Sequence, residues 1–526
     1  MKSTNKLITL ILLLVVIVGC SEDFLDRPSQ SQISANNFYK TTSDMRLATA
    51  SLYSAAWGQW NNGAMLNLGD VLSGNGTTGQ YQGADQIQLY AHSLSASNSI
   101  VRSAWVGMYN VIGQSNNTIL GIEQYAPATI SEIDKKAAIA EARFIRGVAY
   151  FYLAIHWGAV PIVEDNSKLI DNPLIYRAII SDVYKFVTND LTYAAENLPV
   201  MDEKGRVTKW SAQGMLAKVY LTMACLQQTG GSRKQEYLDK AKLYAGSVCK
   251  NSGLILHPSY YDLFRVQFND VPEDLFALQW TAPAEYNLGN ILNNLAPSAD
   301  LMPQKTGAWS SMHPTYEFYL AYTAQDSIRR KATMMLTGDK YPELNAAGGG
   351  YKATGTYMKK HIIGNDKDNS SPLMSWSASP EHNAILRLAD VYLIYAEAIL
   401  GNSNSTTDAD ALLYFNKVRE RAGINPVTSL NYVAILNERH IELGYEGQYW
   451  MDLVRLSYWN PVKAINLLNA QDRRLFTYDP ILKEATPDET TIASVIPATV
   501  SSFTLQIPAT EMTANPKLAK PPVPYY

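Results

Sequence analysis

Amphipathic helical patterns dominate this chain, and they limit its fold more than any other feature of the sequence. Between residues 132 and 157, apolar side chains recur at every third or fourth position, and Gly158 and Pro161 then supply a helix stop. The pattern predicts a long helix that buries one stripe, formed by Ala137, Ala140, Phe144, Val148, Phe151 and Ile155. We expect Phe144 and Phe151 to lie in the core.

Further helical patterns cover most of the chain on either side of this one. Residues 385–400 are apolar nearly all round, which predicts an interior helix. The other predicted helices cover about 43–57, 99–124, 175–197, 209–228, 234–251, 408–422 and 429–445. Short Gly/Pro/Asn connections make neighbouring helices antiparallel. The predicted fold is therefore mostly α: a tetratricopeptide-like helical-repeat scaffold, although no strict repeat of about 34 residues is visible.

Three segments interrupt the scaffold with a different composition. Residues 61–98, about 253–382 and about 471–526 are rich in Gly, Pro, Asn, Ser and Tyr, with short strand-like runs such as 274–280. They predict large irregular loop excursions with a few short strands. Because long loops in compact proteins are usually functional or disordered, we expect them to carry a ligand site. The scaffold (about 36–252 and 383–470) and this loop-rich half would form one unit within residues 20–526.

The N-terminus has the pattern of an export signal. A run of about a dozen apolar residues follows Lys2 and Lys6, too short for a membrane span of roughly 20 residues. The run ends in Val18-Gly19-Cys20, which resembles a bacterial lipobox, so residues 1–19 are interpreted as a lipoprotein signal peptide and Cys20 as the lipidated residue. The alternative is a simple secretion signal with a chance cysteine.

Composition excludes several classes of protein. The net charge of −4 leaves no basic footprint for nucleic acid. Cys225 and Cys249 lie inside helical patterns and are interpreted as buried thiols rather than a disulfide, and no Cys/His cluster predicts a metal or cofactor. Tyrosine is abundant, with 33 residues, which suits half-wet surfaces because the ring is buried while the hydroxyl stays hydrogen-bonded.

Five segments, in order, resemble hallmarks of the SusD-like (RagB/SusD) family of Bacteroidetes outer-membrane lipoproteins. They are "AEARFIRGVAYFYLAIHWGAVPIV" (140–163), "GRVTKWSAQGMLAKVYL" (205–221), "ILRLADVYLIYAEA" (385–398), "LNERHIELGYEGQYWMDLVR" (436–455) and "LQIPATEMTANPKL" (505–518). The resemblance spans the mature chain. It departs from the family at Tyr449, where an arginine is usual, and at the ending "KPPVPYY".

The resemblance implies a cell-surface lipoprotein of the outer membrane without catalytic activity. Such proteins capture a nutrient, most often a glycan or oligosaccharide, and deliver it to a SusC-like TonB-dependent transporter. Their helical repeats face the transporter and their irregular half carries the ligand. The acidic pair Glu22-Asp23 after the cysteine is similar to surface-export signals of this phylum. No cofactor is implied.

Loop aromatics beside amides are the candidate ligand residues. Sugars have an apolar C–H face and a rim of hydroxyls, so a binder needs an aromatic plane flanked by hydrogen-bonding groups. The candidates are Trp309, Trp376, Tyr286, Tyr81, Asn75 and Asn287, with a further cluster of Trp57 and Trp60 beside Asn61 and Asn62. For each single aromatic, packing in the core or in a loop remains the alternative.

Two sets of acidic residues are candidates for catalysis. Asp390 and Glu397 lie two turns apart on one predicted helix face, but an apolar helix that also carries Arg387 favours structural ion pairs. The acids Glu442, Glu446 and Asp452 near Arg439 and Arg455 likewise indicate a charge network. Two alternatives to a glycan-binding protein stay open, a lipid-anchored glycoside hydrolase and a helical-repeat adaptor that binds protein.

Overall fold

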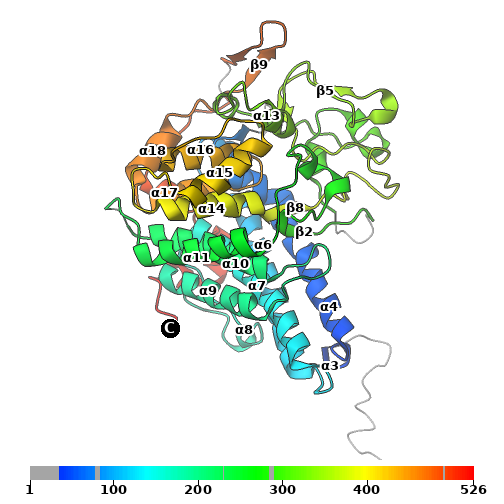
Figure 1. Ribbon diagram of the computed structural model, residues 1–526. Helices are drawn as coiled ribbons and strands as arrows, with labels where there is room; N and C mark the ends of the chain where they lie inside the picture. The colour runs from blue at the N-terminus through cyan, green and yellow to red at the C-terminus, as the bar shows by residue number, and fades with distance from the viewer. Residues whose placement is uncertain (1–34, 78–82, 229, 284–288, 490–491) are drawn as a thin grey trace, which may run out of the picture.

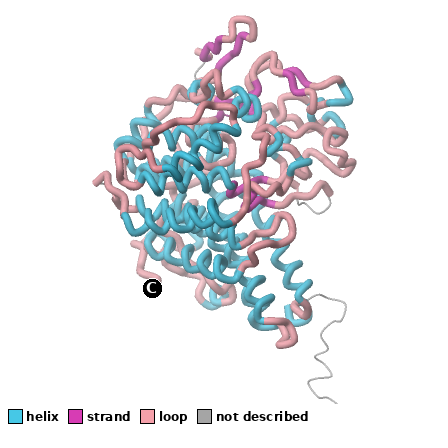
Figure 2. Tube along the Cα trace, viewed as in Figure 1, coloured by secondary structure: helices cyan, strands magenta, loops and turns pink. Residues whose placement is uncertain are grey.

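The computed structural model describes residues 35–77, 83–228, 230–283, 289–489 and 492–526. Stacked helices form one side of the molecule, and short strands, turns and loops gather on the other (Figures 1 and 2). The predicted fold class is confirmed. None of the helices in the described part of the chain is both long and apolar enough to cross a membrane.

The scaffold is a row of helices, most of which pack on the next helix along the chain (Figure 1). Its first part contains α6 (Ser99–Tyr125), α7 (Glu132–Trp157), α9 (Ile180–Asn197), α10 (Lys209–Cys225) and α11 (Gln235–Asn251). After the loop-rich half the row resumes with α14 (Leu388–Leu400), α15 (Ala409–Arg421), α16 (Tyr432–Glu442), α17 (Tyr449–Ser457) and α18 (Pro461–Asn469). Helix α11 packs on α14, so the two parts of the scaffold are continuous in space.

Local sequence explains where the long helices begin and end. Asn98 caps α6 by accepting from the amides of Ile100 and Val101, and Ser131 caps α7 by accepting from the amide of Asp134. Gly158 ends α7 with a φ of +72°, a conformation that glycine adopts without strain. These boundaries agree with the predicted ones to within a few residues.

Helix α7 lies at the centre of the scaffold and is buried beyond its predicted stripe. Phe144 and Phe151 are in the core, as expected, and Phe144 packs edge to face on Phe276 with ring centroids 5.1 Å apart. The charged residues Glu141 and Arg146 are buried too. Arg146 pairs with Asp190 on α9, so the polar side of α7 is a helix–helix interface rather than a solvated face.

The loop-rich half is joined to the scaffold by one antiparallel pair of strands. Strand β2 (Asp274–Leu278) pairs with β8 (Asn383–Arg387), which leads directly into α14. The remaining strand pairs are short: β1 (Gly76–Thr77) with β3 (His313–Pro314), β4 (Met334–Met335) with β7 (Tyr357–Met358), β5 (Lys340–Tyr341) with β6 (Tyr351–Lys352), and β9 (Phe476–Asp479) with β10 (Glu484–Pro487). Two short helices, α12 (Tyr316–Leu320) and α13 (Ser327–Thr333), lie between β3 and β4 in the sequence.

The prediction that residues 61–98 are irregular is wrong over much of that range. After α4 (Thr42–Ala50) the chain continues through short 3₁₀ turns into two π-helical turns, η3 (Trp60–Ala64) and η4 (Asn67–Val71), and α5 (Ala84–Tyr90) follows. Asn and Gly have low helix propensity, but the apolar residues between them are buried against the core. Tertiary packing thus overrides local preference here.

Truncating Phe144 tests this description of the core. We expect Phe144→Ala to lower the free energy of unfolding by about 3–5 kcal/mol, because it removes a buried ring that packs on Phe276. Urea denaturation measures the change. Ile133→Ala is the matched control, since Ile133 is on the same helix but 80% exposed, and it should change stability by less than about 0.5 kcal/mol. Equal midpoints for the two variants would contradict the assignment.

Candidate functional site

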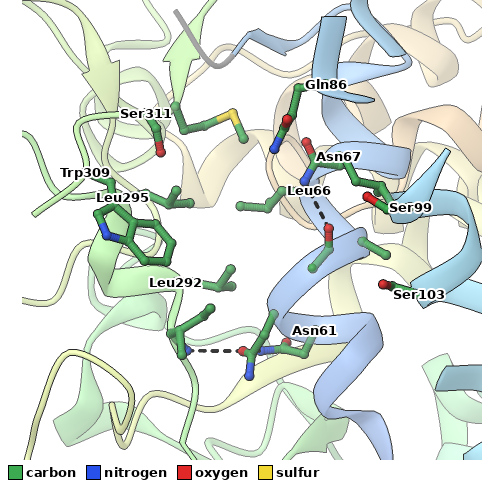
Figure 3. Close-up of a pocket in the computed structure, with 16 residues that line it drawn as sticks. Asn61, Leu66, Asn67, Gln86, Ser99, Ser103, Leu292, Leu295, Trp309 and Ser311 are labelled. Atoms are coloured by element: carbon green, nitrogen blue, oxygen red, sulfur yellow. Dashed lines mark hydrogen bonds between the residues drawn. The ribbon is translucent and has the colours of Figure 1, made fainter. Parts of the chain in front are cut away.

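A cavity of about 290 Å³ opens between the π-helical segment and the loop-rich half (Figure 3). One wall, the helical wall, comes from residues 61–67, Gln86 on α5 and the first turns of α6. The other, the loop wall, comes from residues 291–295 and 309–312. We call this space the amide cavity. It is lined by Asn61, Asn62, Gly63, Ala64, Leu66, Asn67, Gln86, Ser99, Ile100, Ser103, Ile291, Leu292, Leu295, Trp309, Ser311 and Met312.

The helical wall supplies most of the polar groups. In Figure 3, Asn67, Gln86 and Ser99 lie opposite Trp309, and Leu66 lies between the two walls. Asn67 donates to the carbonyl of Gly63 at 3.0 Å, and its Oδ1 has no hydrogen-bond partner among the described residues. π-Helical turns are rare and occur often at functional sites, because the wider turn changes the direction of the side chains it carries.

The loop wall carries the aromatic plane. The Trp309 amide donates to the carbonyl of Asn294 at 2.7 Å, which fixes the backbone beneath the ring. The Trp309 side chain is nevertheless 46% exposed, and its ring makes no contact with another aromatic ring among the described residues. Apolar side chains of Leu292 and Leu295 lie beside it (Figure 3). The ring can therefore receive a ligand.

Two asparagines hold the walls together at one end of the cavity. The Asn62 amide donates to the carbonyl of Gly289 at 3.1 Å, and its Oδ1 accepts from the amide of Ile291, also at 3.1 Å. Asn61 donates to Oδ1 of the buried Asn290 at 3.3 Å. The cavity thus has a defined width before any ligand binds.

The chemistry of the lining suits a neutral polar ligand. Among the described residues that line the amide cavity, none has an ionisable side chain. The lining offers amides, hydroxyls, aliphatic groups and one exposed indole. These groups can form hydrogen bonds and stack on an apolar face, but they cannot transfer a proton in the way that general acid–base catalysis requires.

The second candidate tryptophan lies on the neighbouring loop. All ten tryptophans are in the described part of the chain, and Trp309 and Trp376 are its exposed ones. Trp376 is 51% exposed and does not line the cavity. Its backbone lies so close to residue 307 that a Cβ atom placed on Gly307 would be 2.7 Å from the Trp376 Cβ. The two tryptophan loops therefore touch, while Trp57 and Trp60 are buried in the core.

Asn75 is not placed to bind a ligand, and this prediction needs correction. Its side chain is buried, and its amide donates to Oδ1 of Asp70 at 2.9 Å. The Oδ1 atom of Asn75 lies 2.5 Å from Nε2 of His440. Both ends of the amide are thus engaged inside the protein, next to the strand pair β1–β3.

Four other predicted residues cannot be located. Cys20, Tyr81, Tyr286 and Asn287 lie outside the described residues. The sequence pattern does not predict a ligand role for Asn67, Gln86, Ser99 or Ser103, which line the cavity from three different elements. The one available signal was the cluster of Asn61 and Asn62 after Trp60, and both asparagines do line the cavity.

The acidic residues weighed as catalytic candidates form ion pairs, as predicted. Asp390 accepts from Lys218 at 2.9 Å and Arg439 at 2.5 Å, and Glu397 pairs with Arg233 and Arg455. Burial alone would raise the pKa of Asp390, but these two cations hold it well below its usual value. Permanently charged, paired acids of this kind serve as structural charges rather than as proton donors.

Arg387 does not pair with either of those acids. It donates instead to Glu273 at 2.8 Å, Glu442 at 3.0 Å and Glu446 at 2.7 Å. No group of three or more His, Cys, Asp or Glu side chains within the described ranges could hold a metal ion. Cys225 and Cys249 are free thiols, as expected.

Comparisons with known proteins agree on one family. Residues 281–526 match the family model described as "SusD family", and residues 23–221 match one described as "Starch-binding associating with outer membrane". A SusD-like protein of Bacteroides ovatus is 36% identical over 99% of this chain and 98% of its own length.

Solved structures share the fold of this chain. One determined with xylogluco-oligosaccharide is 36% identical, has a TM-score of 0.83, and the match covers 92% of this chain and 99% of that one. A laminarin-binding SusD-like protein shares the fold, with 21% identity and a TM-score of 0.69 over 91% of this chain and 98% of that one.

Proposed function

The chain belongs to the SusD family, and from that premise we propose that it is a cell-surface lipoprotein that binds a neutral glycan in the amide cavity. It would then deliver the glycan to a SusC-like TonB-dependent transporter of the outer membrane, without chemical change. The observation that carries the proposal is the exposed ring of Trp309 facing a wall of amides and hydroxyls.

Carbohydrate recognition accounts for this combination of groups. A pyranose ring presents C–H groups on its face, which stack on an indole, and hydroxyls around its rim, which bond to amides. Trp309 would take the face, and Asn67, Gln86 and Ser311 would take the rim. Supporting this, a structural neighbour that is 36% identical was determined with xylogluco-oligosaccharide.

A longer ligand would extend along the loops beyond the cavity. The Trp376 loop touches the Trp309 loop, so a second sugar-binding platform at Trp376 is part of the proposal. Tyr81, Tyr286 and Asn287 remain proposed as further contacts, because Gln86 and Ile291, which follow them in the sequence, line the cavity. Asn75 is left out because it is buried.

The two alternative functions have less support. A glycoside hydrolase needs two carboxyl groups on either side of the scissile bond, and the described lining of the amide cavity has none. A helical-repeat adaptor that binds only protein would have no use for an exposed indole beside a cavity lined with amides. The SusC-like partner and the tether at Cys20 rest on the family and on the sequence pattern of residues 1–20.

Removing the Trp309 ring tests the site. We expect Trp309→Ala to weaken binding of xylogluco-oligosaccharide by more than tenfold, above about 1.4 kcal/mol, because the stacking plane is lost. Calorimetry measures the affinity, and thermal melts check the fold, which should be unchanged for a ring that is half exposed. Trp309→Phe is the matched control and should retain more affinity than the alanine variant. Unaltered binding by Trp309→Ala would remove this residue from the site.

The absence of ionisable groups from the described lining predicts a preference for neutral ligands. Xylogluco-oligosaccharide should bind more tightly than oligogalacturonate of equal length, because no cation in the described lining can pair with a carboxylate. For the same reason its affinity should change less than about twofold between low and high salt, since only charged contacts are screened. Tighter binding of the anionic oligosaccharide would overturn the assignment of ligand class.

The tether is tested in cells. Cys20→Ala should abolish incorporation of a labelled fatty acid and reduce surface labelling of the protein, because the acyl chains that anchor it have no attachment site. Cys225→Ala serves as the control, since this thiol is buried in α10. Normal acylation and surface display in the Cys20 variant would refute the lipoprotein assignment.

A further inference from the structure

A buried carboxylate lies behind the helical wall of the amide cavity. Asp70 belongs to the same π-helical turn, η4, as the cavity residue Asn67. Its side chain is buried and accepts three hydrogen bonds. They come from the Asn75 amide at 2.9 Å, the Tyr445 backbone amide at 2.8 Å and the Gly447 backbone amide at 3.0 Å. Asp70 therefore joins the helical wall to the segment between α16 and α17.

The backbone makes this contact unusually close. A Cβ atom on Gly69 would lie 2.2 Å from the Cα of Gly447, so only glycine at position 69 allows these two backbone segments to come so close. Gly447 has a φ of +72°, which directs its amide at Asp70 without strain. The approach places Asp70 within reach of two scaffold amides, those of Tyr445 and Gly447, and it fixes the position of η4 relative to the scaffold.

Asp70 is also linked to the opposite wall. Its partner Asn75 precedes β1, which pairs with β3 in the register Gly76↔Pro314 and Thr77↔His313. The Thr315 amide donates to the carbonyl of Asn75 at 3.1 Å. Strand β3 follows Ser311 and Met312, which line the loop wall. One carboxylate thus connects, through short hydrogen-bonded steps, to the scaffold and to both walls.

We propose that Asp70 is the positioning residue of the amide cavity, holding the helical wall and the loop wall at the separation that a glycan requires. Because the site it positions is the proposed glycan site, this inference rests on the proposed function. Asp70 does not line the cavity, so it acts through Asn67, on its own turn, and through the strand pair that follows Asn75.

Asp70 has to be ionised to accept the three hydrogen bonds that position the walls. As a carboxylate it accepts all three bonds, whereas a protonated or amidated side chain brings a donor to a place where three donors already point. Burial raises the pKa of Asp70 to about 6, although the bonds from Asn75, Tyr445 and Gly447 lower it. A change of pH from 7.5 to 5 therefore converts the ionised group into the neutral one.

One other group near Asp70 titrates in or close to that window, so the Asp70→Asn variant has to separate the two effects. Burial lowers the pKa of His361, but Glu381 at 2.9 Å raises it above its usual value, and the His361 ring lies 2.8 Å from the carbonyl of Tyr445.

The remaining charged groups do not change state between pH 7.5 and 5. Lys360 interacts with the charge of Asp70, but is paired with Glu446 at 2.9 Å. Burial lowers the pKa of His440 to about 3 and raises that of Tyr445 well above its usual value, so both stay neutral. Arg473, which donates to the nearby carbonyl of Leu72, and Arg387, paired with Glu446, remain charged.

The effect on stability has the opposite sign to the effect expected on affinity. A carboxyl group whose pKa is higher in the folded than in the unfolded protein stabilises the fold below about pH 4, and this contribution is lost as pH rises through about 6. Acidification from pH 7.5 to 5 thus does not destabilise the protein through Asp70. A loss of affinity over that range would report positioning, not unfolding.

Asp70→Asn is the test, with Asp190→Asn as its control. Asp190 is equally buried, accepts two hydrogen bonds from Arg146 at 2.7 and 2.8 Å, and lies on α9 of the scaffold. Both variants should lose stability. At pH 7.5, Asp70→Asn should bind xylogluco-oligosaccharide at least tenfold more weakly than wild type, and Asp190→Asn should bind within twofold of it. Equal affinities for wild type and Asp70→Asn would overturn the proposal.

Two further measurements complete the test. Wild-type affinity should fall at least fivefold between pH 7.5 and pH 5, and that dependence should vanish in Asp70→Asn; a dependence that persists in the variant would refute the role of Asp70. Hydrogen exchange needs no glycan: in Asp70→Asn it should accelerate in residues 60–77 and 309–316 but not in α10. If wild type binds no glycan, the proposed function fails, and the exchange pattern alone decides whether Asp70 positions the two walls.

Discussion

The ion pairs around Arg387 are the interaction on which the two halves of the molecule depend. Arg387 lies where β8 meets α14, and its partners come from both halves. Glu273 directly precedes β2, whereas Glu442 ends α16 and Glu446 lies between α16 and α17 of the scaffold. All four side chains are buried. Ions removed from water cost several kcal/mol each unless every charge is paired, so the halves cannot separate without exposing unpaired charge to the interior.

Neighbouring ion pairs also link the scaffold to the loop-rich half. Arg421, at the end of α15, bonds to both Glu273 and Glu442, and Arg329, on α13, bonds to Glu438 and Glu442. Helices from the scaffold and segments from the loop-rich half thereby share the same carboxylates. The result is a rigid frame beneath loops that have little regular structure. A preformed cavity loses less conformational entropy on binding than a flexible one.

The sequence predicted the parts of this structure that are set by local pattern. The helices carry their own periodicity and caps, so α6, α7 and α11 were placed to within a few residues, and the burial of Phe144 follows from its stripe. The sequence predicts that Asp390 and Glu397 form ion pairs with cations, because charged side chains in an apolar helix need partners. Which cations pair with them depends on helices distant in sequence, and Arg387 was misassigned for that reason.

The amide cavity was only partly predictable because its walls come from distant segments. Trp309 was identified as a loop tryptophan among small residues, and it does line the cavity. Residues 61–72 are predicted to be irregular because their asparagines and glycines disfavour helix. The contact that requires glycine at position 69, its approach to Gly447, joins residues far apart in the chain. Asn75 is predicted as a ligand residue because it lies near Tyr81 in the sequence, and nothing in the sequence places His440 beside it.

Tyr449, at the position where the resemblance implies an arginine, lies close to the contacts of Asp70. Its ring stacks on His440 with centroids 3.6 Å apart and planes within 10° of parallel. His440, kept neutral by burial, contacts Asn75, which in turn bonds to Asp70. An arginine at position 449 would place a cation beside this chain of contacts and lower the pKa of Asp70 through its charge. The neutral tyrosine adds no such charge, so burial dominates and the pKa of Asp70 stays raised, at about 6.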